Sequence, residues 1–364
     1  MTQGKVGVYY NYCAASAGSY CWGNGTSDSG SPSSDPNTSS LRDITSDICP
    51  YGWHLPTSTS SGEFQALYTA YSSNVTNFQT ALSTPLSGYF SSGKAYYQGD
   101  RGSFWSSTWN NSTSMYRLLV NSTSVTPSYY YSRNYGYSVR CVFDPPMQEV
   151  TVADLSEGEE KTVIDARDGK DYTIKKINGA LWMTQNLRFT GTSVPSATSN
   201  VTADKTMTYY DLATNGTSGG KCYGTSSSGD GYSNACIKDS GSTSTGVWYN
   251  YYAATAGTIS GTSNSTVASQ DICPKNWHLP SYDTSSPAGS INSISLASQI
   301  APFNPSGGGR YNNGSLNYTD CGFWWTDTAR NATERRIMSY DGSSPAIESY
   351  YRRYGLFVRC VRSS

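Results

Sequence analysis

Two histidines occur in the chain, and each lies inside the same short sequence, Trp-His-Leu-Pro. A histidine that works as a general base needs a nucleophile or an orienting carboxylate within hydrogen-bond reach. Neither His54 nor His278 has such a partner repeated next to the motif in both places. We therefore interpret both histidines as polar side chains that satisfy backbone groups at a helix entrance, beside a packed tryptophan, and we expect no enzymatic activity.

Nine cysteines offer a second kind of chemistry, and their spacings are not those of a metal site. Four of them occupy matching positions in two similar parts of the chain, so one bridge inside each part is the simplest pairing. Two further pairs are candidates for short loop bridges. The predicted disulfides are Cys49–Cys141, Cys273–Cys360, Cys13–Cys21 and Cys222–Cys236. Cys321 is then either free or paired outside the chain, and the cysteine content predicts an extracellular or cell-surface location.

Tyrosine, arginine and asparagine crowd two stretches, each between a tryptophan-containing segment and a final cysteine. Tyrosine gives rigid amphipathic contact area at low entropic cost, and asparagine adapts its hydrogen bonds, so the composition is typical of binding surfaces. The alternative is structural, because tyrosine also favours half-exposed strands. The predicted ligand-binding residues are Trp109, Asn111, Tyr116, Tyr129, Tyr131 and Arg133 in the first stretch, and Trp324, Asp327, Arg335, Tyr340, Tyr350, Tyr351 and Arg353 in the second.

The two stretches belong to two copies of one domain, because three motifs recur in the same order. Gly-Val-x-Tyr-Asn-Tyr begins at residues 7 and 246, Asp-Ile-Cys-Pro-x-x-Trp-His-Leu-Pro at 47 and 271, and Val-Arg-Cys-Val at 139 and 358. The spacing between the motifs differs, which places length changes in loops. We predict a first domain at residues 1–144, a linker at 145–162 and a second domain at 163–364.

The second copy contains a front part that the first copy lacks. Residues 163–165 and 170–177 flank an Asp-Gly turn signal and predict a hairpin, which Trp-Met-Thr-Gln-Asn-Leu follows at 182–187. Without these segments, the last strand of the first domain would have an unpaired edge. We expect the linker, the second domain or another chain to cover that edge, so self-association through the incomplete first domain is one outcome.

The overall composition is neutral and polar without being that of a disordered chain. The net charge of −1 argues against a nucleic-acid partner, which would need a basic face. Only 14% of the residues are charged, but the 13% that are aromatic supply apolar bulk for a core. No apolar run is long enough for a membrane-spanning helix.

The order of local patterns predicts an α+β fold. Ser60 and Glu63 have the spacing of a capping box, and apolar residues follow at helical intervals up to Tyr71. A looser stripe from Ile291 to Ile300 predicts the counterpart helix. The predicted closing strands cover 104–108, 115–120 and 138–143, and again 323–326, 335–339 and 356–361. Each domain should therefore combine mainly antiparallel strands, one or two helices and long loops.

These motifs together resemble the Fibrobacter succinogenes major paralogous domain family. The second copy carries the whole pattern, at 169–177, 182–187, 273–280, 324–325 and 358–361. The first copy matches at 49–56, 105–108 and 139–142 but lacks the front motif. The resemblance implies a bacterial secreted or surface protein of two tandem C-type-lectin-like domains. In that fold the first and last strands lie together, and a disulfide joins the helical region to the last strand.

Ligand residues of that fold do not carry over to this chain. Calcium-dependent lectins of the fold have Glu-Pro-Asn or Gln-Pro-Asp with Trp-Asn-Asp, whereas here only Trp109-Asn110-Asn111 occurs. Asp165, Asp168 and Asp171 lack the alternating oxygen pattern of a calcium loop. We therefore expect no metal and no cofactor.

The sequence thus predicts a binding or adhesion protein that recognises a protein or glycan ligand. Retroelement-diversified proteins of the lectin fold vary in the same tyrosine-rich region, which makes a diversified binding protein one form of this hypothesis. A structural subunit of a surface fibre or layer is the first alternative. An oxidase of the formylglycine-forming type, which uses copper and a cysteine pair, is the second.

Overall fold

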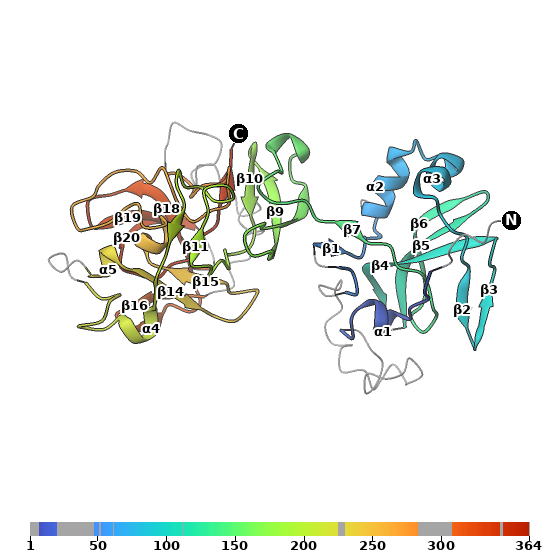
Figure 1. Ribbon diagram of the computed structural model, residues 1–364, viewed down its shortest axis with the longest axis horizontal. Coiled ribbons are helices and arrows are strands. Elements are labelled where there is room, and N and C mark those ends of the chain that lie inside the picture. Colours follow the sequence, from blue (N-terminus) through green and yellow to red (C-terminus); the bar gives the residue numbers. More distant parts are fainter. Residues whose placement is uncertain are drawn as a thin grey trace. The chain divides into compact units, whose positions relative to one another are not determined.

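The computed structural model describes residues 7–19, 47–50, 52–60, 62–111, 113–224, 230–282, 308–342 and 345–363. The chain divides into two compact units, Met1–Asp144 and Pro145–Ser364, which we call unit 1 and unit 2. Both are built mainly from antiparallel strands with a few short helices (Figure 1). None of the helices described is long and apolar enough to cross a membrane.

A three-stranded antiparallel sheet forms the centre of unit 1. Its strands are β4 (Arg101–Asn111), β5 (Ser114–Asn121) and β6 (Val125–Ser132), with β5 in the middle. Two helices, α2 (Glu63–Ala70) and α3 (Val75–Leu82), cover one side of it (Figure 1). Their Phe64 and Phe78 are buried in one cluster with Phe104 and Leu118 of the sheet.

Short elements complete unit 1 around a second buried cluster of Tyr12, Trp105 and Tyr137. These elements are α1 (Tyr12–Ala15), β1 (Trp53–His54), β7 (Val142–Phe143) and the hairpin of β2 (Tyr89–Ser91) and β3 (Lys94–Tyr96). The Trp105 indole N–H donates to the Tyr10 carbonyl at 2.7 Å, which ties the sheet to the chain before α1. β1 pairs with β7, so the last strand returns beside the Trp-His-Leu-Pro motif.

The predicted first helix is confirmed as α2, but the prediction that Ser60 and Glu63 form its capping box is wrong. The N-cap is Gly62, which has no side-chain cap. The Glu63 carboxylate instead accepts a hydrogen bond from the Thr57 N–H at 2.9 Å and lies 2.8 Å from the His54 ring. Helix α3 was not predicted, and the counterpart helix expected at 291–300 lies outside the described residues.

Unit 2 contains the same central sheet and a further four-stranded sheet (Figure 1). The central sheet is β18 (Gly322–Ala329), β19 (Glu334–Tyr340) and β20 (Pro345–Tyr351). The other is β8 (Glu160–Ile164), β9 (Asp171–Ile177), β10 (Ala180–Met183) and β21 (Val361–Arg362), and it contains the predicted front hairpin. The closing strands β7 and β21 are shorter than predicted, because the residues before them form only isolated bridges.

The remaining elements of unit 2 are small; η2 precedes β8, and the others lie between β10 and β18 in the sequence. They are η2 (Val152–Asp154), β11 (Ser193–Val194), β12 (Lys205–Thr206), β13 (Tyr209–Asp211), α4 (Leu212–Asn215), α5 (Asp230–Ser233), β14 (Ala235–Asp239), β15 (Val247–Tyr249), α6 (Tyr251–Ala254), β16 (Arg310–Asn312) and β17 (Ser315–Asn317). β16 and β17 form a hairpin like β2 and β3. Trp325 donates to the Tyr249 carbonyl at 2.7 Å, as Trp105 does to Tyr10, so the two units share one frame.

Residues 145–162, expected as a linker, belong to the packed structure of unit 2. Met147, Val150 and Leu155 are buried in its main core, and β8 begins at Glu160. The indole N–H of the fully buried Trp277 donates to the Met147 carbonyl at 2.8 Å. The Asp144-Pro145-Pro146 sequence predicted a turn-forming linker, but the apolar residues that follow are buried in the core.

Three predicted disulfides are present: Cys49–Cys141, Cys273–Cys360 and Cys222–Cys236. They indicate that the protein folds in an oxidising environment. The predicted Cys13–Cys21 bridge falls partly outside the described residues, because Cys21 is not among them. Among the described cysteines, Cys321 is free and half-buried.

One aspartate in each unit holds the Asp-Ile-Cys-Pro-x-x-Trp-His-Leu-Pro segment in a closed loop. The Asp47 carboxylate accepts from the Cys49 N–H at 2.8 Å and from the Leu55 N–H at 2.7 Å. Asp271 accepts from Cys273 and Leu279 in the same way, both at 2.9 Å. These hydrogen bonds therefore hold the two ends of the loop together next to the disulfide cysteine.

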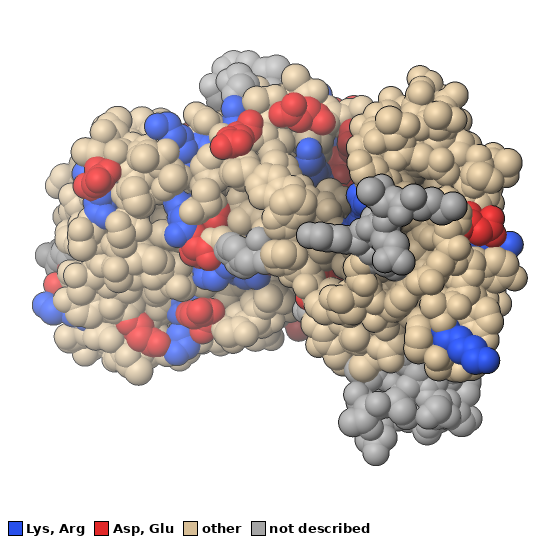
Figure 2. All heavy atoms as spheres, turned by 45° about the vertical axis from the view of Figure 1, so that its right-hand side comes forward, with Lys and Arg blue, Asp and Glu red and all other residues tan. Residues whose placement is uncertain are grey.

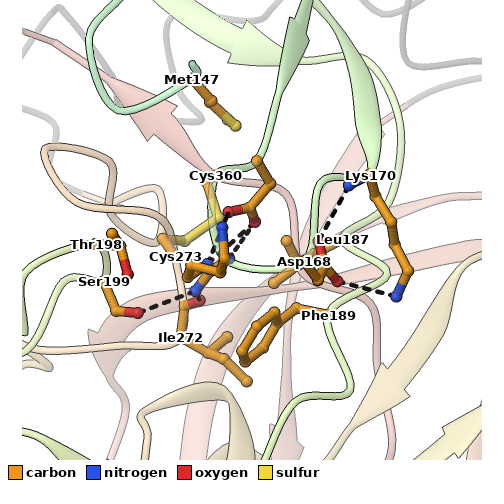
Figure 3. Close-up of polar contacts among 12 residues, drawn as sticks. Met147, Asp168, Lys170, Leu187, Phe189, Thr198, Ser199, Ile272, Cys273 and Cys360 are labelled. Atoms are coloured by element: carbon orange, nitrogen blue, oxygen red, sulfur yellow. Dashed lines mark hydrogen bonds and ion pairs between the residues drawn. A yellow bond between two sulfur atoms is a disulfide. The ribbon is translucent and has the colours of Figure 1, made fainter. Parts of the chain in front are cut away.

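The aspartates of the front hairpin are all paired with basic side chains. Asp165 and Arg167 form a buried ion pair at 2.6 Å, and the Arg167 guanidinium also stacks 4.1 Å from the Phe189 ring centroid. Figure 3 shows the Cys273–Cys360 disulfide and the contact between Asp168 and Lys170, whose charged atoms lie 3.0 Å apart. Removing one partner of the buried Asp165–Arg167 pair would leave an uncompensated charge in the interior.

The tryptophan of Trp-His-Leu-Pro allows a matched test of the two units. Trp277 is 0% exposed and Trp53 is 44% exposed. Trp277→Ala should lower the free energy of unfolding by roughly 3–5 kcal/mol, because it empties a core site. Trp53→Ala should lower it by about 1 kcal/mol or less, as expected for a surface change. Urea denaturation of both variants measures the difference, and equal losses would contradict the structural distinction.

Candidate functional site

The two histidines have different surroundings although their motif is the same. In unit 1, His54 Nε2 lies 2.8 Å from Glu63 Oε2, and Nδ1 lies 2.8 Å from Asp144 Oδ1. In unit 2, His278 Nδ1 lies 2.8 Å from the Leu279 carbonyl instead. The interpretation of His54 as bonded to backbone groups is therefore wrong. Neither carboxylate could be recognised from the sequence, because Glu63 begins the next helix and Asp144 follows the last strand.

The two carboxylates hold His54 in its protonated form. Burial by itself lowers the His54 pKa, but hydrogen bonds and charge from Asp144 and Glu63 outweigh it and raise the pKa to about 10. Burial works against the Glu63 carboxylate as well, yet His54 and Thr57 lower its pKa. A protonated imidazole cannot accept a proton, so this group joins β1, α2 and the residue after β7 through a partly buried ionic contact.

A second arrangement of side chains in unit 1 is an arginine surrounded by tyrosines. Arg117, on the middle strand β5, is buried, and its guanidinium carbon lies 5.2, 5.4 and 4.4 Å from the ring centroids of Tyr129, Tyr131 and Tyr137. Such distances are those of cation–π contacts. Burial lowers the Arg117 pKa, while the neighbouring tyrosines act in the opposite direction.

The β2–β3 hairpin extends this arrangement to the surface. Tyr89 stacks on Tyr96 and Tyr135, with centroid distances of 5.4 and 5.3 Å, and Tyr135 lies 4.8 Å from Tyr131. A hydrogen bond with Tyr135 raises the pKa of Tyr131, so this phenol stays neutral. We call the group the first cluster; its members are Arg117, Tyr89, Tyr97, Tyr129, Tyr131, Tyr135 and Tyr137.

Unit 2 contains a corresponding second cluster. Arg310, on β16, places its guanidinium carbon 3.9 Å from the Tyr350 ring centroid, 5.1 Å from Tyr354 and 4.9 Å from Tyr318. Phe323 lies beneath, at 5.6 Å. Tyr350 also donates to Glu348 at 2.6 Å, and burial together with this carboxylate raises the Tyr350 pKa. The members of the second cluster are Arg310, Tyr318, Phe323, Tyr350 and Tyr354.

The strand registers show that Tyr131 and Tyr350 occupy equivalent positions, whereas Tyr129 corresponds to Glu348. Tyr131 pairs opposite Met115 on β5, and Tyr350 opposite Arg335 on β19. The arginines do not correspond. Arg117 is opposite Trp105, where unit 2 has Ile337 opposite Trp325. Arg310 instead comes from the hairpin. Each unit therefore places an arginine against an equivalent tyrosine, but a different strand supplies the arginine.

One tyrosine in each cluster has a strained backbone. Tyr97 and Tyr318 both follow the second strand of the hairpin, and both have a φ of +56°. A bulky side chain in the left-handed region is rare and costs free energy, so it persists where the surroundings or the function require it. Tyr318 is 61% exposed, so its ring is available to another molecule.

Several residues predicted to bind a ligand are buried within their own unit. Arg133 and Arg335 are both 0% exposed, and Trp324 donates its indole N–H to Asn186 at 2.8 Å in the interior. These three predictions are wrong, because arginine and tryptophan can serve as core side chains as well as contact residues. The Asn111 side chain is exposed, but it accepts from Thr113 and Ser114 and so fixes the β4–β5 turn.

The other predicted residues divide between the clusters and their margins. Tyr129, Tyr131 and Tyr350 are cluster members. Tyr351 and Arg353 lie beside the second cluster, where Arg353 is 4.8 Å from the Tyr351 ring and 5.5 Å from Tyr354. The structure places the rest outside both clusters and at most half-exposed: Trp109, Tyr116, Asp327 and Tyr340.

Sequence reasoning missed Arg117, Arg310 and both hairpins, and a signal for the hairpins was present. Tyr-Tyr at 96–97 and Tyr318 each follow a short Gly-centred turn, in the same place relative to the repeat. Charged side chains do not gather into a one-signed patch on the face shown in Figure 2; they are scattered, with opposite signs close together. The aromatic clusters are therefore the distinctive surfaces.

The chain matches no protein-family model, and comparisons with curated proteins and with solved structures found no match. The geometry of the two units therefore carries the functional argument.

The His54 contact makes the stability of unit 1 depend on pH. Because the folded-state pKa is about 10 and the ordinary value is 6.5, the stabilisation is complete below pH 6.5 and is lost as the pH rises to 10. On the acid side, the Glu63 contribution is lost as the pH falls through its lowered pKa. Urea denaturation across this range should show that the free energy of unfolding falls more steeply with rising pH for the natural chain than for His54→Gln. His278→Gln is the matched control and should keep the slope; identical slopes for all three chains would refute the assignment.

Proposed function

We propose that the protein is an extracellular or cell-surface binding protein that contacts a protein or glycan ligand through its two aromatic clusters. One observation carries this proposal: the equivalent tyrosines Tyr131 and Tyr350 each lie against an arginine, although that arginine comes from β5 in one unit and from β16 in the other. Packing alone does not require a cation at this place, since Ile337 fills the position of Arg117 in unit 2.

The chemistry of the clusters suits a neutral or weakly acidic partner. Tyrosine faces cover C–H surfaces of sugars or peptides, and the phenol groups donate and accept hydrogen bonds. The arginine holds the rings in place and adds positive charge under them. Two such surfaces on one chain also permit binding with avidity when a target offers two copies of its epitope.

The domain type belongs to the same proposal. The pairing of β1 with β7, and the disulfide from the Cys-Pro segment to the last strand in each unit, are the features that a C-type-lectin-like member of the Fibrobacter succinogenes major paralogous domain family should have. The oxidase alternative loses its main support, because Cys273 and Cys360 are bonded to each other. A surface-fibre subunit is the remaining alternative and predicts assembly without added ligand.

A test begins with a glycan and protein array probed with the full chain, followed by variants in the second cluster. Tyr318→Ala and Tyr351→Ala should each weaken binding at least roughly tenfold, as hot-spot aromatics do. Thermal unfolding should change little, because both side chains are exposed. Val267→Ala, at an exposed apolar side chain of unit 2 outside the cluster, is the control and should bind normally. Unchanged binding in both cluster variants, or an equal loss in the control, would disprove the proposal.

A further inference from the structure

Unit 1 contains an apolar cavity beside its last strand. Its volume is about 460 Å³. The walls come from α2, from β4 and β5 of the central sheet and from β7. The lining residues that matter below are Ala66, Phe104, Leu118, Arg140 and Val142. A cavity of this size in a small domain is large enough for an aromatic side chain, and its apolar walls favour one over water.

In unit 2 the equivalent place is filled by a tryptophan. By strand register, Phe104 and Leu118 of unit 1 correspond to Trp324 and Met338 of unit 2. By the repeated Val-Arg-Cys-Val motif, Val142 corresponds to Val361. In unit 2 these residues form one buried cluster with Trp182, which is 0% exposed. Trp182 belongs to β10, which runs along β21 with Trp182 opposite Val361 and Leu181 opposite Arg362.

No strand in the described part of unit 1 takes the place of β10. There β7 pairs with β1 alone. The apolar side chains next to it are uncovered, since Phe143 is 51% exposed and Trp53 is 44% exposed. An unpaired edge above an apolar cavity is the arrangement that β-strand addition uses, with main-chain hydrogen bonds for affinity and a side-chain pocket for specificity.

Asn186 adds a second recognition element in unit 2. Its side-chain oxygen accepts from Arg359 Nε at 2.8 Å and from the Trp324 indole at 2.8 Å. Arg140 is the counterpart of Arg359, and it lines the cavity of unit 1. Unit 1 therefore has a counterpart of the Arg359 donor, which is Arg140, but it has Phe104 in place of the Trp324 donor.

We propose that unit 1 binds an extended peptide segment of the β10 type along the free edge of β7. The segment places a tryptophan in the cavity and an asparagine, four residues later, on Arg140. The occupant is thus a strand with the pattern Trp-x-x-x-Asn, as at 182–186, supplied from outside the described part of unit 1. This interaction is independent of the ligand bound by the aromatic clusters.

Titration calorimetry of the full chain with a synthetic peptide of residues 178–188 tests the proposal. We expect one saturable site. Replacing the tryptophan of the peptide by alanine should weaken binding at least roughly tenfold, since it removes the anchor. Absence of saturable binding, or equal binding of the two peptides, would overturn the proposal.

Variants of the full chain locate the site. Ala66→Trp places a large ring at the cavity and should abolish peptide binding. Ala95→Trp, at an exposed alanine of β3, is the matched control and should bind normally. Peptide binding that survives Ala66→Trp would mean exchange with β10 of unit 2 and would overturn the assignment to unit 1.

A double-mutant cycle tests the polar contact. Arg140→Gln should weaken the natural peptide and have little further effect on a peptide with alanine in place of the asparagine. Additive losses would contradict the proposed contact between Arg140 and the asparagine.

Discussion

Both units depend on the way one carboxylate closes the Asp-Ile-Cys-Pro-x-x-Trp-His-Leu-Pro loop. Asp47 and Asp271 each accept two backbone N–H groups at opposite ends of that loop, which puts the cysteine and the histidine at fixed places along it. The disulfide then brings the last strand to the loop, and the strand pairs beside the histidine. These contacts therefore join the loop to the closing segment in both units. Asp271 is buried and Asp47 is half-buried, and losing either bond leaves a polar group unpaired.

The shared frame separates positions that must pack from positions that are open to change. Trp105 and Trp325 make the same hydrogen bond, to the residue before the N-cap of α1 in unit 1 and of α6 in unit 2, and both indoles are buried. The cluster positions tolerate exchange of residue type: Tyr89 is replaced by Arg310 on the hairpin, and Arg117 by Ile337 on the middle strand. A cation remains among tyrosines after both exchanges. The protein therefore shows two solutions to one packing problem, and each leaves tyrosine rings at the surface.

The repeat, three disulfides and the antiparallel strand-rich architecture could be predicted from the sequence because they rest on local or covalent features. Matching motifs identify equivalent cysteines, and alternation identifies strands. The contact residues were harder. Residue type alone does not tell which face of a strand is buried, so Arg133, Arg335 and Trp324 were assigned to a surface although they are core side chains. Arg117 and Arg310 were missed because each meets its tyrosines only after distant strands pair. The same reason hid the carboxylates around His54, and apolar residues at 147–155 turned an expected linker into part of a core.

Cys321 provides a free thiol in the turn that follows Tyr318 of the second cluster. It is free and half-buried, and its backbone N–H donates to the carbonyl of Tyr318 at 2.9 Å. Burial, with nearby carboxylates, raises the pKa of its thiol, so the reactive thiolate is a minor species at neutral pH and air oxidation is slow. The thiol can nevertheless be alkylated at mildly alkaline pH, while the bonded cysteines stay inert. A fluorescent dye attached there would sit one short turn from the exposed ring of Tyr318, and its emission would respond to whatever molecule settles on that ring.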